Sequence, residues 1–381
     1  MRITIVQGAF LPVPPLRGGA VEKYWLALGR EFARRGHTVT QLSRWCDGLP
    51  AEETRDGVRQ VRVRGYDAPR SGLVLKWRDL LYSRRVIGAL PPADILVTNT
   101  FWLPLLAKDA SRGKIYVHVA RFPKGQHRLY TRAARIQCVS TVVANAVLAQ
   151  CPALKPRVKV LLNALPDGAW EPQPLPDESR DPVVFYAGRI HPEKGLDLLA
   201  AAWTHPRAQT ALAGWKLVLA GPWAVEQGGR GENYRAQLAE KFSPATNSVE
   251  WTGPLFSAEA DKLHQLYRRA RIFVYPSLAA QGEALPSAPL EAMAAGTPCV
   301  VSNLDCFKDY LRPDENGVVF DHTAENAPEK LAEALANFAQ NSALRSKLGA
   351  AAWATAAHFR VEEVASGYLN DFESLLAARS P

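Results

Sequence analysis

The stretch Glu283–Ser302 has the sequence EALPSAPLEAMAAGTPCVVS and predicts three consecutive elements. A proline-containing loop leads into a short helix, Gly296 and Pro298 end that helix, and Cys299–Ser302 forms a buried strand. Another apolar run, Ile272–Pro276, precedes the loop and predicts a strand of its own. A strand, a helix and a strand in this order form a βαβ unit, which implies a parallel sheet.

Strands and helices alternate in the same way along the rest of the chain. Further strands are predicted at Val183–Ala187, Lys216–Ala220, Ser248–Thr252 and Gly317–Phe320, and in the first half at Arg2–Val6, Val39–Leu42, Val58–Val63, Asp94–Thr98, Lys114–Val119, Ile136–Ser140 and Val158–Leu162. The proline-rich stretch between the two series is typical of a linker. The pattern predicts two α/β, Rossmann-like domains with doubly wound sheets, at 1–165 and 180–359, with a linker at 166–179.

The composition limits the class of protein. Of 381 residues, 47% are hydrophobic and 22% are charged, which excludes a wholly disordered or a collagen-like chain. No apolar run approaches the roughly 18 residues of a membrane-spanning helix, and the first residues, MRITIVQGAF, lack the basic and apolar regions of a signal peptide. The five cysteines are scattered and form no CxxC pair. We therefore expect a cytoplasmic protein with neither a disulfide framework nor a zinc site.

Charge is divided unevenly along the chain. Residues 1–163 carry 27 Lys and Arg against 10 Asp and Glu, a net charge of +17, whereas the remainder carries 19 against 27, a net charge of −8. A basic half can face anionic lipid, an anionic acceptor or nucleic acid. It can also be a solvated surface without a partner. Because the basic half shows no repeated aromatic and basic platform, we expect no nucleic acid partner.

Two cations share one predicted loop after the strand Val183–Ala187. The loop is Gly188–Gly195, GRIHPEKG, and it leads into a helix. Arg189 and Lys194 can both reach one anion from this loop. A diphosphate needs at least two cationic donors, because negative charge builds on it when it departs as a leaving group. A solvated turn with incidental charges is the alternative interpretation.

Two carboxylates stand eight residues apart in the stretch that begins at Glu283. Glu283 lies on the loop, and Glu291 lies in the first turns of the short helix. The free N–H groups at a helix start can bind phosphate. A carboxylate just inside the helix can accept two hydrogen bonds from a ribose diol, and the other carboxylate can hold sugar hydroxyls. Alternatively, a glutamate near a helix start only complements the helix dipole.

Two weaker features belong to the first half of the chain. In Arg17–Glu22, RGGAVE, Gly18 and Gly19 let the backbone approach a ligand closely at a helix start, although such a pair also serves packing alone. His118 ends a predicted strand, where it can hydrogen-bond a sugar hydroxyl; a satisfied core histidine is the alternative. The other histidines show no metal-binding spacing, and we expect no metal site.

In their order along the chain, these motifs resemble the retaining GT-B glycosyltransferases, and above all glycosyltransferase family 4. The resemblance implies two Rossmann-like domains that face each other across a cleft and close over a UDP- or GDP-linked sugar. It also implies that a C-terminal helix, 360–381, crosses back to the N-terminal domain. The roles that it implies by position are diphosphate binding for Arg189 and Lys194, ribose binding for Glu291, sugar binding for Glu283 and His118, and a loop over the phosphates for Gly18 and Gly19.

Under the same resemblance, two further segments are expected to contact the phosphate groups and the base of the nucleotide. Many relatives have a glycine-rich stretch after the first glutamate, with backbone N–H groups toward phosphate, where this chain has Ala284–Ser287. Pro286 has no N–H to donate. The segment 249–255, VEWTGPL, matches the glycine that follows a strand in the family. The expected donor-binding residues are therefore Leu285 and Ser287 at the phosphates, and Gly253, Pro254 and Leu255 at the base.

The family implies sugar transfer with the anomeric configuration retained. Its favoured route is a front-face displacement, in which a donor phosphate oxygen helps to deprotonate the incoming hydroxyl, without a metal or another cofactor. The protein then supplies positioning and charge stabilisation. The alternatives are a GT-B enzyme of other chemistry, such as a nucleotide-sugar epimerase, and a catalytically silent glycosyltransferase-like subunit.

The acceptor is expected on the N-terminal domain, as in the family. The charge of +17 there favours an anionic or membrane-held acceptor, a saccharide or a lipid-linked one, in cell-envelope or exopolysaccharide synthesis. The segment Arg70–Arg85, RSGLVLKWRDLLYSRR, has the pattern of a basic interfacial helix that holds a protein on the inner face of the plasma membrane. Alternatively, the apolar face of this helix packs on the sheet.

Overall fold

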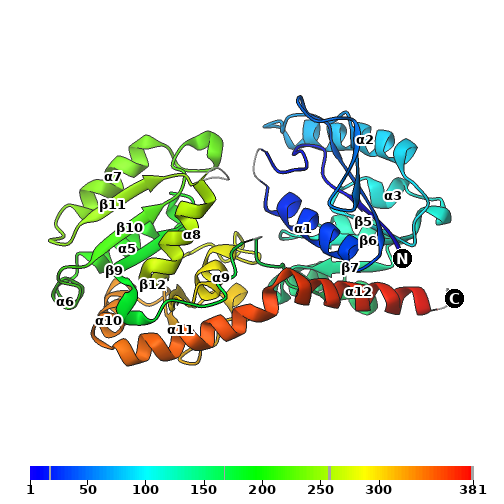
Figure 1. Ribbon diagram of the computed structural model, residues 1–381. Coiled ribbons are helices and arrows are strands. Elements are labelled where there is room, and N and C mark those ends of the chain that lie inside the picture. Colours follow the sequence, from blue (N-terminus) through cyan, green and yellow to red (C-terminus); the bar gives the residue numbers. More distant parts are fainter. Residues whose placement is uncertain (17–18, 167, 256–258, 379–381) are drawn as a thin grey trace. The chain divides into compact units, whose positions relative to one another are not determined.

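The computed structural model describes residues 1–16, 19–166, 168–255 and 259–378. The chain divides into two compact units: Met1–Asp167 together with Phe359–Pro381, here called the N-terminal unit, and Gly168–His358, the C-terminal unit. Each unit is built around its own sheet of mainly parallel strands (Figure 1). The predicted α/β class with two parallel-sheet domains is confirmed.

The N-terminal unit has an eight-stranded sheet in the order β3-β4-β2-β1-β5-β6-β7-β8. All strands run parallel except β3, which forms a hairpin with β4 and was not predicted, because its sequence EETR is polar and mostly exposed. The elements are β1 (Arg2–Val6), α1 (Ala20–Arg34), β2 (Thr38–Arg44), β3 (Glu52–Arg55), β4 (Val58–Val63), α2 (Gly72–Ala89), β5 (Ile95–Thr98), α3 (Leu103–Leu106), β6 (Lys114–Val119), β7 (Arg135–Cys138), α4 (Thr141–Gln150), β8 (Val158–Val160) and α12 (Val361–Ala377).

The core of the N-terminal unit joins helices from opposite ends of the sequence. α1 and α12 lie side by side (Figure 1), and their buried side chains include Trp25, Leu28 and Phe32 of α1 and Tyr368 and Phe372 of α12. Asp371 of α12 accepts hydrogen bonds from the Tyr116 hydroxyl (2.9 Å) and from Arg135 Nη2 (2.7 Å). These contacts attach the C-terminal helix to the sheet of the N-terminal unit, which is where the resemblance places it.

The C-terminal unit has a six-stranded, wholly parallel sheet in the order β11-β10-β9-β12-β13-β14. The carboxyl ends of β9 and β12 lie next to each other, because these two parallel strands are neighbours in the sheet. The elements are β9 (Asp181–Ala187), α5 (Leu196–Trp203), α6 (Pro206–Ala211), β10 (Lys216–Ala220), α7 (Glu232–Phe242), β11 (Val249–Gly253), α8 (Ala260–Arg269), β12 (Ala270–Tyr275), α9 (Ser287–Ala294), β13 (Cys299–Ser302), β14 (Val318–Phe320), α10 (Ala327–Gln340) and α11 (Ser342–Ala356).

Two buried arginines fix the segment that precedes β9 to the C-terminal unit. Arg345 of α11 donates from Nε and Nη2 to the two carboxylate oxygens of Asp177, at 2.8 and 2.6 Å. Arg180 donates to the carbonyl oxygen of Ala295 at 2.9 Å, and its burial lowers its pKa to about 10. Charge-assisted hydrogen bonds of this kind hold the end of the predicted linker on the C-terminal unit.

No helix within the described ranges is both long and apolar enough to span a lipid bilayer.

Candidate functional site

The loop after β9, residues 188–195, is bonded to the loops that follow its two neighbouring strands. Toward β10, the N–H of Ile190 donates to the carbonyl oxygen of Pro222 at 2.9 Å. Toward β12, the N–H of Leu278 donates to the carbonyl oxygen of Glu193 at 2.8 Å. Three loops therefore meet at the carboxyl edge of this sheet, which is the edge where open α/β sheets bind ligands.

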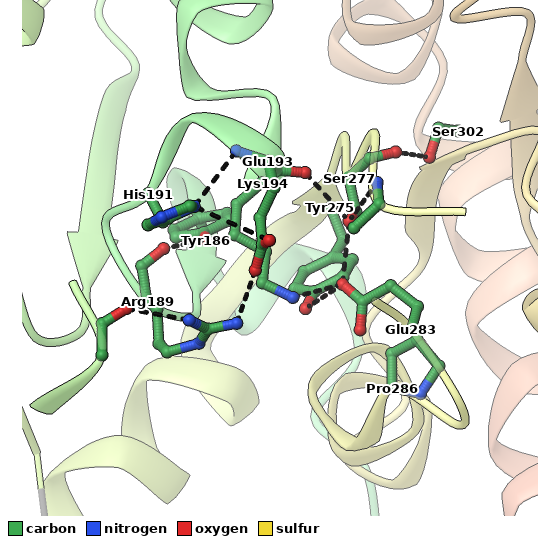
Figure 2. Close-up of polar contacts among 12 residues, drawn as sticks. Tyr186, Arg189, His191, Glu193, Lys194, Tyr275, Ser277, Glu283, Pro286 and Ser302 are labelled. Carbon is green, nitrogen blue, oxygen red and sulfur yellow. Dashed lines mark hydrogen bonds and ion pairs between the residues drawn. The ribbon is translucent and has the colours of Figure 1, made fainter. Parts of the chain in front are cut away.

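A buried ion pair joins two of the predicted site residues. Lys194 Nζ lies 2.5 Å from Glu283 Oε1, and each of the two residues is only 5% exposed (Figure 2). The same carboxylate oxygen accepts hydrogen bonds from the Tyr275 hydroxyl at 2.9 Å and from the Ser277 hydroxyl at 2.8 Å. Burial, and next the Glu283 charge, raise the pKa of Tyr275 well above its usual value, so its hydroxyl stays protonated and donates.

A close backbone approach places Lys194 beside the end of β12. Lys194 lies in a short 3-10 turn, Pro192–Lys194, and Gly195 follows it with φ of 70°. A Cβ atom at position 195 would lie 1.9 Å from the carbonyl oxygen of Pro276. Only glycine fits this left-handed position against the neighbouring backbone. The Lys-Gly pair of the GRIHPEKG motif therefore has a structural reason: the glycine lets the lysine reach Glu283.

Arg189, the other predicted cation, is also paired with a carboxylate. Its Nη2 lies 2.5 Å from Glu193 Oε1, and its Nη1 donates to the carbonyl oxygen of Gly228 at 2.8 Å (Figure 2). The Arg189 side chain is 42% exposed, so part of the guanidinium remains open to solvent. A guanidinium has five N–H donors and an ammonium has three. Both cations can therefore keep these contacts and still donate to an anion; their role in diphosphate binding stays a prediction.

The start of α9 has fewer backbone donors than an ordinary helix start. The helix begins at Ser287, with Pro286 before it and Pro289 in its first turn. The first N–H groups of a helix have no intrahelical partner, and proline has no N–H. The helix start therefore offers the N–H groups of Ser287 and Ala288. The sequence predicted Leu285 and Ser287, so the structure adds Ala288, while Leu285 lies before the helix.

The remaining donor-site candidates lie at the ends of different elements of the C-terminal unit. Glu291 is partly buried one turn into α9, and its carboxylate contacts the hydroxyl of Tyr267, whose pKa is raised by burial and next by this charge. Gly253 ends β11, and a Cβ at its position would lie 3.5 Å from the ring of Trp223. The partly buried Pro254 and Leu255 follow Gly253 directly. The ribose and base contacts assigned to these residues stay predictions.

The candidates of the N-terminal unit are differently placed. Gly18 lies outside the described residues, and Gly19 directly precedes α1. His118 is 3% exposed, and its Nδ1–H donates to Gln137 Oε1 at 2.5 Å, while its ring stacks on Tyr24 with centroids 5.8 Å apart. Burial lowers the pKa of His118 to about 4. The ring is therefore enclosed in this structure, and its sugar contact stays a prediction.

Several residues of the C-terminal site were not predicted from the sequence. Tyr275 and Ser277 are two residues apart at the end of β12, and the period of two along a strand places both side chains on one face. That spacing was a usable signal. Glu193 and Gly228 contact Arg189 through the fold of two loops, and no local pattern indicates the contact of Gly228. Among the described residues, no group of three or more His, Cys, Asp or Glu could hold a metal ion.

Two family models match the chain. Residues 171–354 match the model described as "Glycosyl transferases group 1", and residues 19–123 match "Glycosyl transferase 4-like domain". The first match contains the whole of the site built around Lys194 and Glu283. The second match lies in the N-terminal unit, which carries the basic excess.

Individual proteins resemble the chain over nearly its whole length. D-inositol 3-phosphate glycosyltransferase from Nocardioides sp. is 26% identical over 394 residues, which are 91% of this chain and 83% of the relative. Among solved structures, sucrose-phosphate synthase from Thermosynechococcus elongatus superimposes with a TM-score of 0.74 at 18% identity and covers 99% of both chains. HepE from Anabaena in complex with UDP and glucose has a TM-score of 0.69 at 16% identity, over 98% of this chain and 100% of HepE. At these identities, the structural matches show a shared fold.

Proposed function

The chain belongs to the GT4-type glycosyltransferases of the GT-B fold, and we propose that it transfers a sugar from a nucleotide-diphosphate sugar to a hydroxyl of a saccharide or lipid-linked acceptor. One observation supports the choice of a nucleotide-diphosphate sugar as the donor. Arg189, Lys194, Glu283 and the start of α9 belong to neighbouring loops at the carboxyl edge of one parallel sheet. Cations, a buried carboxylate and helix N–H groups together suit an anionic leaving group that carries a sugar.

The C-terminal unit is the proposed donor site. Arg189 and Lys194 bind the diphosphate with N–H groups that their carboxylate partners leave available, and Ser287 and Ala288 add backbone donors. Glu291 accepts hydrogen bonds from the ribose diol. HepE, which shares the fold, was solved with UDP and glucose, and this supports UDP ahead of GDP as the nucleotide.

Glu283 is proposed to hold the donor sugar and not to attack it. One of its carboxylate oxygens already accepts hydrogen bonds from Lys194, Tyr275 and Ser277. Three donors on one oxygen disperse its charge and make it a poor nucleophile, and they also fix the direction of the other oxygen. A carboxylate oriented in this way is suited to accept hydrogen bonds from sugar hydroxyls.

The proposed reaction is a front-face displacement that retains the anomeric configuration. The acceptor hydroxyl oxygen forms a bond to the anomeric carbon on the face from which the diphosphate departs. The bond from that carbon to the phosphate oxygen breaks, and the hydroxyl proton passes to the departing phosphate. Arg189 and Lys194 stabilise the negative charge that develops on the diphosphate. Because the protein supplies this charge, we propose that the reaction needs no metal.

The acceptor is proposed to be anionic or lipid-linked and to bind the N-terminal unit, in cell-envelope or exopolysaccharide synthesis. Residues 1–163 carry a net charge of +17, which attracts anionic groups over distances of about a Debye length. The relative from Nocardioides is named for a phosphorylated compound, D-inositol 3-phosphate. This name supports an acceptor with a negative charge.

The donor proposal is tested by thermal shift without added metal. UDP, GDP, ADP and their sugars are compared on the wild type, on Glu291→Ala, and on Glu250→Ala as a control in the same unit, where Glu250 pairs with Lys216 at the surface. A ligand at 100 times its Kd stabilises the folded state by about 2.7 kcal/mol. We expect one nucleotide diphosphate to raise the Tm of the wild type and the control, and to lose this effect in Glu291→Ala.

Two results would count against the proposal. If no nucleotide shifts the Tm, the chain is better explained as a catalytically silent subunit. If a nucleotide sugar binds and is converted to an isomer without an acceptor, the chemistry is that of an epimerase. Nuclear magnetic resonance of the anomeric proton in the transfer product tests retention directly.

A further inference from the structure

Helix α2 of the N-terminal unit has two dissimilar halves. In its second half, Asp79, Tyr82, Ser83 and Val86 are buried. This half therefore packs against the rest of the N-terminal unit, which was the alternative interpretation of the sequence. In its first turns, by contrast, the exposed apolar side chains are Leu73 (82%), Trp77 (59%), Val74 (37%) and Leu75 (37%). Ten large hydrophobic side chains are exposed in the described part of the chain, and four of them belong to these five consecutive positions. Such a concentration of apolar surface marks an interaction site.

Cations are frequent on and next to the same helix. Within three residues of the patch lie Arg70, Lys76 and Arg78, and about two turns farther along α2 lie Arg84 and Arg85. The only acidic residue of α2, Asp79, is buried and accepts hydrogen bonds from the N–H groups of Phe101 and Trp102, both at 3.1 Å. No carboxylate of the helix therefore offsets the exposed positive charge.

Aromatic rings contact three of these cations. Lys76 Nζ lies 5.2 Å from the centroid of the Phe101 ring, and the guanidinium groups of Arg78 and Arg85 lie 5.6 and 5.2 Å from the Tyr66 ring. Cation–π contacts limit where the charges can move. These cations are thus held beside the two rings, whereas Leu73 and Trp77 are exposed in the first turns of α2.

We propose that the first turns of α2, Gly72–Trp77, insert their apolar side chains into an anionic phospholipid surface while the flanking cations bind the headgroups. Charge complementarity favours an anionic phospholipid surface over other partners. An apolar groove of a protein would match the leucines but not the neighbouring cations, and a nucleic acid would match the cations but not the exposed leucines. The link to a lipid-held acceptor rests on the proposed function, whereas the docking itself does not.

The test is co-sedimentation of the full-length chain with vesicles. One set contains phosphatidylcholine alone, and the other contains about 30% phosphatidylglycerol. Leu73→Ser/Trp77→Ser removes the two most exposed apolar side chains of the patch. The matched control is Val225→Ser, because Val225 is 66% exposed but belongs to the C-terminal unit. We expect the wild type and the control to bind the anionic vesicles, and the double variant to bind about tenfold more weakly.

Three outcomes would overturn the proposal: no binding to either vesicle, equal binding to both, or unchanged binding of the double variant. A concentration-dependent dimer of the wild type that the double variant lacks, without vesicle binding, would assign the patch to a second copy of the chain. Unchanged circular dichroism and an unchanged nucleotide-induced Tm shift in the double variant separate this result from misfolding and from a failure of the donor site.

Discussion

Buried polar groups at the carboxyl edges of the two sheets differ in their hydrogen bonding. In the C-terminal unit, Glu283 is buried and its oxygen is bonded to a lysine, a tyrosine and a serine. Near the ends of β1 and β6 in the N-terminal unit, the side-chain amide of Gln7 and Nε2 of His118 are buried without a hydrogen-bond partner among the described residues. Gln7 directly follows β1, and His118 belongs to β6.

The difference indicates at which of the two edges the buried polar side chains have all found hydrogen-bond partners within their own unit. A fully bonded network in a low-dielectric interior is rigid and holds its charges in place. Buried groups without partners cost free energy that the surrounding core has to offset. The candidate site of the C-terminal unit is therefore held by its own side chains, whereas Gln7 and His118 of the N-terminal unit keep buried polar atoms without a hydrogen-bond partner among the described residues.

Removing the cation from the bonded network is expected to have the largest effect. Lys194→Met leaves the Glu283 carboxylate buried without its partner, which typically costs about 3–5 kcal/mol. We expect the urea midpoint of the C-terminal unit's unfolding transition to fall accordingly. The double variant Lys194→Met/Glu283→Gln removes both charges and should recover most of the loss. A single variant as stable as the wild type would show that the network does not support the unit.

The enclosed histidine of the N-terminal unit should make stability depend on pH. The pKa of His118 is about 4 in the folded chain and about 6.5 when unfolded. The unfolded state therefore binds more protons between these values, and stability falls as the pH drops from about 6.5 toward 4. Between pH 7 and 4.5 the wild type should lose roughly 2–3 kcal/mol more than His118→Gln.

The comparison with His118→Gln is needed because other groups titrate in the same range. Burial lowers the pKa of His127 to about 4, which acts in the same direction, and raises that of Asp79 to about 6, which acts in the opposite direction. Chemical denaturation at both pH values gives the difference. Equal losses in the two proteins would mean that the His118 ring is solvated and open to a ligand.

The smallest expected effect concerns the position of Arg189. Gly228 has φ of 85°, and a Cβ there would lie 3.0 Å from Cδ of Arg189. Gly228→Ala should displace the guanidinium and weaken nucleotide binding by about fivefold, or about 1 kcal/mol. Gly214→Ala is the matched control, because Gly214 has φ of 80° and no atom within 4 Å of its Cβ position. Titration calorimetry with UDP measures both, and equal affinities would contradict the proposed role of Arg189.

The C-terminal site was largely predictable, because its residues lie in short motifs at strand ends. Arg189 and Lys194 share one loop, and Glu283 and Glu291 share one loop and helix, so local spacing placed each pair near the same sheet edge. The direct pairing of Lys194 with Glu283 was not predictable. It joins residues 89 positions apart, and it depends on β9 and β12 being neighbours in the sheet.

The N-terminal unit was less predictable at the level of side chains. His118 lies in the expected strand, but the sequence did not show that Tyr24 and Trp25 of α1 would contact its ring. The apolar residues of α2 have the spacing of a helix in both halves. Only the structure distinguishes the buried Tyr82 from the exposed Leu73, because burial depends on which side chains meet other segments of the fold.

By itself, the sequence determined the two α/β units, the basic and acidic halves, and the motifs of the proposed donor site, because periodicity, charge and short spacings are local properties of a chain. The tertiary structure decided which charges neutralise each other, which histidine is enclosed and which turns of a helix stay exposed. These are properties of distance and burial between segments far apart in the sequence. The strength of an ionic or hydrogen-bonding interaction depends on both, through the local dielectric and the loss of water.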